Sequence, residues 1–271
     1  MTAVRLLDTN AMPWGAWHKQ FPGTYAKALF DDPSNNTNLR LAFLPQGFKL
    51  PKHVRHHHGK TREGVFVLFG NVPYREYRTP KDTAGRLFDF QQGFLLDRPP
   101  RSIHGISVDP ASTLGCMVLE WGTGPLDFNY VPFEGDLEAL GTDYQDPHVA
   151  DSKAMSWQPH PEVPGWKLKV LSSGGNSPVS GYHPACLVHV PGGWQPKTEV
   201  RGKPAPFRRW TFVVHGDLDL TTQDEGGKRE KRRLKEGGYL EWNNPATVGF
   251  DPTPASEIGC VLFCLGHRLI G

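Results

Sequence analysis

The chain repeats itself, and this internal repeat limits the folds that are open to it. Residues 110–122 read PASTLGCMVLEWG and residues 254–266 read PASEIGCVLFCLG, so that Pro, Ala, Ser, Gly, Cys and Gly recur at one constant offset. At nearly the same offset, residues 66–70 (FVLFG) correspond to residues 212–216 (FVVHG), and Gly93 corresponds to Gly237. Matches in this many ordered segments indicate two copies of one structural module.

Glycine and proline are frequent between short apolar segments. The 271 residues include 30 Gly and 25 Pro, a density that breaks long helices and suits short strands joined by turns. Segments such as 39–44 (LRLAFL), 64–69 (GVFVLF) and 210–214 (WTFVV) are rich in β-branched, aromatic and other apolar residues. We therefore expect an all-β protein with an N-terminal domain of residues 1–148 and a C-terminal domain of residues 149–271.

Charge and cysteine content narrow the class of protein. The 30 basic and 28 acidic residues nearly cancel, so nothing favours nucleic acid or an anionic membrane as a partner. The N-terminus lacks the apolar core of a signal peptide, and no stretch approaches the ~20 apolar residues of a membrane span. The four cysteines form no CxxC pair, which favours reduced, buried thiols in a cytoplasmic protein. The basic run 228–235 (KREKRRLK) is interpreted as a solvated hairpin strand.

Four histidines lie within the six residues 53–58 (HVRHHH), and a carboxylate follows at Glu63. His56 and His58 are two residues apart, so on a strand both imidazoles project from one face, and His57 projects from the other. Glu63 is near enough along the chain to reach the same pocket after a bend. A further donor must come from a distant strand, and His104, at the end of the segment 93–104, supplies one.

With these residues the sequence resembles the cupin superfamily. The first cupin motif, G…HxH, three or four residues, E, six residues, G, is matched by Gly47, His56, His58, Glu63 and Gly70. The second motif, G-x5-P-x-G-x2-H-x3-N, is matched at Gly93, Pro99 and His104, with Arg101 in place of the usual glycine and Val108 in place of the asparagine. The gap after Gly47 has eight residues rather than five, which leaves open whether His53 takes a ligand place.

The resemblance covers both halves of the chain and implies a bicupin, in which two tandem jelly-roll barrels (double-stranded β-helices) each enclose a pocket. It also implies one divalent metal ion in the N-terminal module, ligated by His56, His58, Glu63 and His104. A surface patch of imidazoles would not account for His104 at the end of the second motif. The position of the histidines inside the chain excludes the remnant of an affinity tag.

The second copy has lost all four donors. At the positions of the three donors in the first motif it has Gly202, Pro204 and Arg209, and at the position of the fourth it has Val248. We expect the C-terminal domain to lack metal ligands. Such a module would be structural, form the surface of a homodimer, or contribute a wall of the first pocket.

Three neutral imidazoles and a carboxylate suit Fe, Mn, Ni, Co or Zn, and Fe(II) is favoured here. Four protein ligands leave two neighbouring positions open on an octahedral ion, and the formal charge of about +1 favours a small anionic or enolisable substrate. The hypothesis is an iron-dependent dioxygenase that cleaves an enolisable or phenolic compound. Glu63 would tune the metal or act as a base, Arg101 would hold the anionic end of the substrate, and Tyr74 would face the pocket; Arg98 is a second candidate for binding a carboxylate.

Two alternatives stay open. With Mn, Zn or Ni the ion would act as a Lewis acid in an isomerase, lyase or decarboxylase that needs no dioxygen. A cupin that binds a small molecule without turning it over is the third hypothesis, because the fold hosts many unrelated functions. The sequence shows no phosphate-binding loop and no nucleophile elbow.

Overall fold

The structure is a computed structural model of the 271-residue chain. It describes residues 4–18, 21–33, 37–49, 55–79, 81–105, 110–123, 129–130, 147–172, 184–201, 209–242 and 246–266. Across these ranges the regular elements are β-strands and one short 3-10 helix, η1 (Thr9–Ala11), so the all-β prediction is confirmed. None of the described helical segments has the length and apolar character that a bilayer-spanning helix requires.

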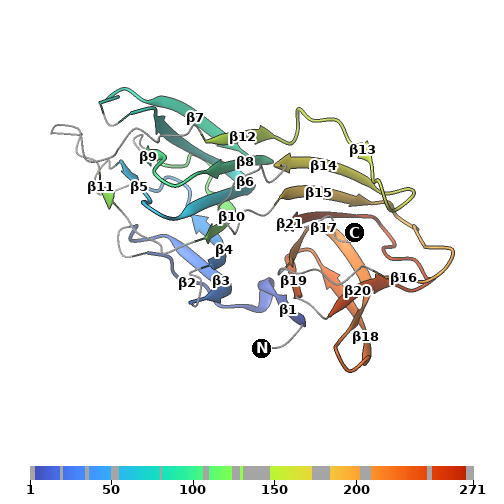
Figure 1. The fold of residues 1–271 in the computed structure, drawn as a ribbon. Helices are drawn as coiled ribbons and strands as arrows, with labels where there is room; N and C mark the ends of the chain where they lie inside the picture. The colour runs from blue at the N-terminus through green and yellow to red at the C-terminus, as the bar shows by residue number, and fades with distance from the viewer. Residues whose placement is uncertain are drawn as a thin grey trace. The chain divides into compact units, whose positions relative to one another are not determined.

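The chain divides into two compact units, and each contains one antiparallel sheet (Figure 1). The N-terminal unit is Pro13–Lys153, and the C-terminal unit is Ala154–Gly271 together with Met1–Met12. Strand pairing explains this division, because β12 (His148–Asp151) pairs with β8 (Phe94–Arg98) and β1 (Val4–Asp8) pairs with β19 (Gly238–Trp242). Two domains split between residues 148 and 149 stay a prediction.

The N-terminal unit is organised around the long strand β6. Its first half pairs with β8 and β10, and its second half pairs with β7 and β9. The main path of the sheet, which runs through β6, has the strand order β11-β5-β9-β6-β10-β4-β3-β2. The bounds of the remaining strands are β2 (Gly15–Ala16), β3 (Tyr25–Asp32), β4 (Thr37–Leu44), β5 (His56–His57), β6 (Arg62–Tyr77), β7 (Arg86–Gln91), β9 (Ile103–Gly105), β10 (Cys116–Thr123) and β11 (Asn129–Tyr130).

The C-terminal unit repeats this pairing scheme. Its order β13-β14-β15-β21-β17-β19-β1 corresponds to β2-β3-β4-β10-β6-β8-β12 of the N-terminal unit, and β18 pairs with β17 as β7 pairs with β6. The sequence repeat is therefore also a repeat of strand order, while two closed tandem barrels stay a prediction. The bounds are β13 (Gln158–Pro159), β14 (Lys167–Ser172), β15 (Ala185–Val190), β16 (Val200–Arg201), β17 (Arg209–Gln223), β18 (Arg229–Lys235), β20 (Thr247–Phe250) and β21 (Cys260–Leu265).

Glycines at equivalent positions fix the bends of the two long strands. Gly70 in β6 has φ 73°, and a Cβ atom there would lie 1.7 Å from the carbonyl oxygen of Gly115. Gly216 in β17 has φ 82°, and its Cβ atom would lie 2.0 Å from the carbonyl oxygen of Gly259. Only glycine fits such a close backbone approach with a positive φ. This requirement accounts for the glycines that the two copies share.

Each unit has its own buried apolar cluster. In the N-terminal unit the cluster consists of Phe21, Ala42, Leu44, Phe48, Val67, Val72, Phe90, Leu96, Ala111, Cys116 and Val118. In the C-terminal unit it is larger and includes Trp166, Cys186, Leu220, Trp242, Val248, Phe250 and Cys264. All four cysteines are buried and none forms a disulfide. The basic run forms β18, whose side chains are mostly exposed.

Candidate metal centre

Two short paired strands bring the histidines of both motifs together. His56 lies in β5 and is paired in register with His104 in β9, while His58 follows directly after β5. One ring nitrogen from each of these three histidines can be chosen so that all lie within 4.8 Å of one another. The ring centroids are 4.4 to 5.4 Å apart. His57 is not part of this cluster, as strand alternation predicts, and His53 lies outside the described residues.

The His104 ring is held in the tautomer that a metal requires. Its Nδ1 lies 2.9 Å from the carbonyl oxygen of Ser102, which accepts a hydrogen bond, so Nδ1 carries the proton and Nε2 keeps its lone pair. Nε2 is buried and makes no hydrogen bond within the described part of the chain. A carboxylate oxygen of Glu63 lies 3.3 Å from this Nε2. Two acceptors facing each other at this distance repel unless a cation lies between them.

Burial keeps the imidazoles of His56 and His104 neutral. Desolvation, and then the neighbouring His58 ring, lowers the pKa of His56 from 6.5 to about 3. Desolvation, and then the charge of Arg98, holds the pKa of His104 well below 6.5. Neutral imidazoles offer lone pairs to a metal, whereas protonated imidazoles would repel it.

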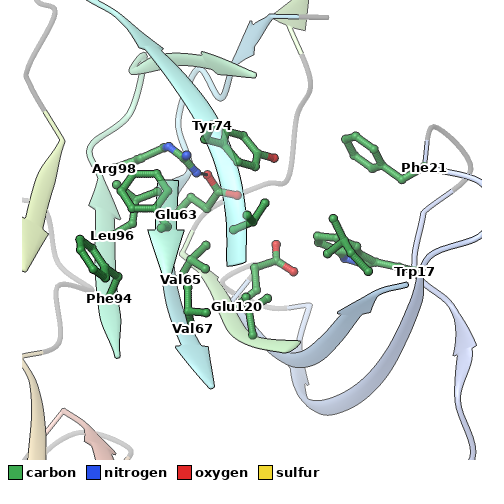
Figure 2. Close-up of a pocket in the computed structure, with 14 residues that line it drawn as sticks. Trp17, Phe21, Glu63, Val65, Val67, Tyr74, Phe94, Leu96, Arg98 and Glu120 are labelled. Atoms are coloured by element: carbon green, nitrogen blue, oxygen red, sulfur yellow. Dashed lines mark hydrogen bonds and ion pairs between the residues drawn. The ribbon is translucent and has the colours of Figure 1, made fainter. Parts of the chain in front are cut away.

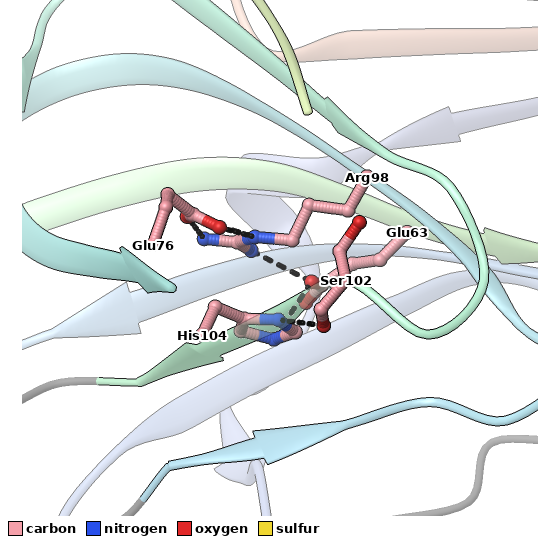
Figure 3. A network of polar contacts seen from close by, with 5 residues as sticks. All are labelled: Glu63, Glu76, Arg98, Ser102 and His104. Carbon is pink, nitrogen blue, oxygen red and sulfur yellow. Dashed lines mark hydrogen bonds and ion pairs between the residues drawn. The ribbon is translucent and has the colours of Figure 1, made fainter. Parts of the chain in front are cut away.

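A buried arginine, Arg98, anchors the carboxylate of Glu63 beside the histidine cluster (Figure 3). Arg98, at the end of β8, donates to Glu63 at 2.7 Å and to Glu76 at 2.6 Å. Its guanidinium carbon also lies 4.7 Å from the centre of the Tyr74 ring. Burial opposes the ionisation of Glu63, but the paired Arg98 and the nearby His58 hold the pKa of that carboxyl below its ordinary value. Glu63 is therefore an ionised and oriented carboxylate beside His104.

A largely enclosed cavity adjoins the hollow that His56 and His58 border, and Figure 2 shows residues that line it. Glu63, Tyr74 and Arg98 form its polar end, and Trp17 and Phe21 approach from the opposite side. The remaining walls come from Leu44, Val65, Val67, Val72, Phe90, Phe94, Leu96, Val118 and Glu120. A smaller adjoining hollow is bounded by His56 and His58 and shares Trp17, Phe21, Glu63, Tyr74 and Glu120 with the larger cavity.

No protein-family model matches the chain, and no curated protein matches it by sequence. Among solved structures, the E. coli protein Ylba is similar over 98% of this chain and 91% of that chain, with a TM-score of 0.61 and 12% identity. Streptomyces albus HEPD, with 2-hydroxyethylphosphonate and Fe(II) bound, is similar over 97% of this chain and 76% of that chain, with a TM-score of 0.65 and 10% identity. Bacillus subtilis oxalate decarboxylase, a protein with Mn(II) centres, is similar over 97% of this chain and 78% of that chain, with a TM-score of 0.61 and 16% identity.

These three are cupin-fold proteins. The chain has a cupin-like fold. At sequence identities this low, the similarity shows the fold alone. Support for the candidate metal ligands comes from the geometry of the residues in this chain. In this cupin-like unit the histidine cluster supports a divalent metal ion.

The donor set fits such an ion. A metal bound at ~2.1 Å to two ligands at right angles separates them by about 3 Å, and the contact from Glu63 to His104 is 3.3 Å. The three histidines of the cluster would hold the ion together with Glu63, which lies beside His104, and this set of four ligands stays a prediction. Three imidazoles and a carboxylate match the preferences of first-row divalent metals and leave the identity of the metal open.

The two other residues with a predicted catalytic role lie in different surroundings. Tyr74 lines the cavity and is partly buried, and desolvation raises the pKa of its phenol, so the hydroxyl keeps its proton and can donate a hydrogen bond. Arg101 is exposed and is not among the residues that line the two adjoining cavities. Its φ is 71°, which explains why cupins usually have glycine at this position. Its role in holding a substrate anion stays a prediction.

Sequence reasoning missed Glu120 and Glu76. Glu120 lies in the middle of β10 and projects into the cavity, where one of its carboxylate oxygens makes no hydrogen bond within the described residues. Burial raises its pKa to about 7, although Arg40 lies 3.9 Å away. Glu76 is the second partner of Arg98. The available signal is a single glutamate inside the apolar run 116–121 (CMVLEW), where the second copy has Cys264 in an entirely apolar run.

Proposed function

We propose that this chain is a bicupin enzyme with two tandem jelly-roll barrels and one metal ion, bound in the N-terminal unit. The favoured reaction is the Fe(II)-dependent cleavage of a small enolisable or phenolic substrate by dioxygen. The observation that carries the proposal is the buried cluster of His56, His58 and His104 next to an anchored carboxylate. The cluster adjoins an enclosed cavity, which gives a substrate a place to bind away from water.

When bound, Fe(II) supplies a Lewis-acidic centre at which dioxygen oxidises the substrate, and both oxygen atoms enter the cleaved products. The protein residues prepare the substrate. Glu120, with a pKa of about 7, is suited to accept the proton that an enolisable or phenolic substrate loses near neutral pH. Tyr74 donates a hydrogen bond to the substrate oxygen, and Arg98 keeps Glu63 ionised and oriented. Val65, Phe94 and the other apolar walls exclude water.

A Lewis-acid lyase or decarboxylase is the second candidate. It is favoured by the fold likeness to oxalate decarboxylase, which has Mn(II) centres. Such a reaction uses the same ligands and the same acid-base residues, but it needs no dioxygen. A protein that binds the small molecule without turnover is the third candidate, and it would show saturable binding in every metal form.

The deciding experiment compares protein loaded with Fe(II), Mn(II) or Zn(II) on one panel of enolisable and phenolic compounds. Dioxygen consumption and product formation are measured in air and under nitrogen. Our proposal predicts turnover in the Fe(II) form only, with one dioxygen consumed per product formed. His104→Ala should abolish this activity, and His57→Ala, the matched control on the opposite face of the strand, should keep it. Turnover that persists under nitrogen, or with Zn(II) and never with Fe(II), contradicts the dioxygenase.

A further inference from the structure

The cavity beside the histidine cluster is apolar over most of its surface. Among the residues that the structure describes, the charged ones that line it are Glu63, Arg98 and Glu120, and these lie at its polar end and on one side. The apolar lining residues are Trp17, Phe21, Leu44, Val65, Val67, Val72, Phe90, Phe94, Leu96 and Val118. Apolar walls of this kind bind hydrocarbon in preference to water.

The cationic side chains around the cavity are already neutralised. Arg98 pairs with both Glu63 and Glu76, at 2.7 and 2.6 Å. Arg40, which borders the smaller hollow, lies 3.9 Å from Glu120. Any further anion in the larger cavity would therefore meet carboxylates without a cation of its own. Burying an unpaired charge in such surroundings is strongly unfavourable.

The available space limits what fits. The cavity offers ≈ 40 Å³ to the centres of water-sized molecules, which is about three times the ~10–15 Å³ that a single water requires. This volume accepts a chain of a few carbon atoms. The shared walls at Glu63, Tyr74 and Glu120 connect it to the hollow at His56 and His58.

We propose that this cavity binds a short, uncharged hydrocarbon substituent of the substrate, while the oxygen-bearing head of the same molecule binds at the histidine cluster. A substrate with a carboxylate at the far end of that substituent is excluded. The placement of the head rests on the proposed function, whereas the specificity of the cavity rests only on its walls. This inference narrows the substrate class to neutral compounds that carry a short alkyl group next to an enolisable or phenolic oxygen.

Two series of probes test the inference on the full-length protein. The first is a series of hydroxamic acids, from acetohydroxamic to pentanohydroxamic acid, titrated into the Zn(II)-loaded protein by calorimetry. The second is the series from 1-propanol to 1-pentanol, which has no chelating head, followed by methyl NMR of the valine and leucine residues. Each methylene that enters the cavity should tighten binding about fourfold. Succinic monohydroxamic acid, which ends in a carboxylate, should bind at least about a hundredfold more weakly than pentanohydroxamic acid, a hydroxamate of similar length.

Matched variants locate the effect. Val67→Leu and Val118→Leu reduce the cavity, and each should flatten the dependence on chain length in both series while acetohydroxamic acid still binds. Val213→Leu is the control, because Val213 holds the position of Val67 in the C-terminal unit. It should leave both series unchanged. Methyl NMR of each variant verifies that the unit remains folded.

The outcomes separate the cavity from the metal site. Fourfold steps in the alcohol series that Val67→Leu removes support the inference, even where no hydroxamate binds, and in that case the metal-dependent function is wrong. An alcohol series without such steps overturns the inference, whatever the metal does. Equal binding of succinic monohydroxamic acid and pentanohydroxamic acid overturns it as well.

Discussion

The interiors of the two units differ at positions that are equivalent in strand order and register. In the N-terminal unit Glu63 pairs in register with Arg98, and in the C-terminal unit Arg209 pairs in register with Trp242. Arg40 and Glu120 face each other across β4 and β10, where the C-terminal unit has Cys186 and Cys264. Glu76 and His104 are paired across β6 and β9, where it has Thr222 and Val248.

Most of the replacements exchange buried polar side chains for members of an apolar core. Cys186, Trp242, Val248 and Cys264 all belong to the apolar cluster of the C-terminal unit, which also contains Trp166 and Phe250. A buried ion pair contributes little net stability compared with well-packed apolar residues, because both charges must be desolvated. At three of these positions, those of Arg98, Glu120 and His104, the C-terminal unit therefore has apolar side chains, although Arg209 remains buried at the position of Glu63. The N-terminal unit retains the buried Glu63–Arg98–Glu76 network, which stability alone does not require.

The largest expected effect concerns the ligands. His56→Ala, His58→Ala and His104→Ala should each abolish stoichiometric metal binding. Removing a residue that only hydrogen-bonds to a ligand lowers metal affinity about 10–100-fold, and losing a ligand itself should lower it further. His57→Ala should keep the metal, because His57 lies outside the cluster. Elemental analysis after gel filtration measures both results. Loss of metal in His57→Ala together with retention in His56→Ala would show that the register of β5 is wrong.

The second effect compares Arg98→Ala with Trp242→Ala at the equivalent position. Arg98→Ala leaves Glu63 and Glu76 buried without their cation and should cost about 3–5 kcal/mol of unfolding free energy at pH 7. Trp242→Ala opens a cavity and should cost a similar amount, about 3–5 kcal/mol. The two losses respond differently to pH, because protonating the two carboxyls relieves only the first.

Chemical denaturation of both variants at pH 7 and pH 5 gives the comparison. We expect the loss in Arg98→Ala to shrink at pH 5 and the loss in Trp242→Ala to stay constant. An Arg98→Ala variant as stable as the parent at pH 7 would mean that the buried ion network does not stabilise the N-terminal unit.

The third effect is the pH dependence that the buried Glu120 adds to the stability of the N-terminal unit. The unfolded carboxyl titrates near 4.5, whereas burial raises the pKa of the folded one to about 7. The cost of burying its charge is therefore absent below pH 4.5, grows as the pH rises from 4.5 to 7, and is constant above 7. Glu120→Gln removes this cost and should stabilise the protein by about 3 kcal/mol at pH 8 and by almost nothing at pH 4.5. Equal stability of both proteins at pH 8 would show that Glu120 is solvated or fully paired.

The smallest effect concerns the strained residue in the second motif. Arg101 has φ 71°, a conformation that costs an L-residue about 1–2 kcal/mol. Glycine avoids this strain, but ordering glycine on folding costs more conformational entropy, which offsets part of the gain. Arg101→Gly should therefore raise the unfolding free energy by up to about 1 kcal/mol. The same variant tests the predicted substrate role, because a raised KM with unchanged kcat would support an anion contact at Arg101. Kinetic constants that remain unchanged would leave Arg101 without a role in binding.

The sequence predicts those features that depend on local patterns. Alternation at His56, His57 and His58 identifies the face that carries the ligands, and the shared glycines reveal the repeat before any strand is placed. The sequence does not predict the partners of Arg98, because Glu63 and Glu76 lie 35 and 22 residues away and meet it only through pairing of β6 with other strands. For the same reason Arg98 and Arg101 could not be distinguished beforehand, although one is buried in the network and the other is exposed.

We propose that the N-terminal unit binds one metal ion and that the C-terminal unit, with Val248 in place of His104 and Arg209 in place of Glu63, binds none. Elemental analysis of the full-length protein, reconstituted with Fe(II) or Mn(II) and freed of loosely bound ions, tests it directly. The account predicts one equivalent per chain in the parent protein, none in His104→Ala, and one in Val248→Ala, the equivalent position of the C-terminal unit. Two equivalents in the parent, or one equivalent that survives in His104→Ala, would contradict the account.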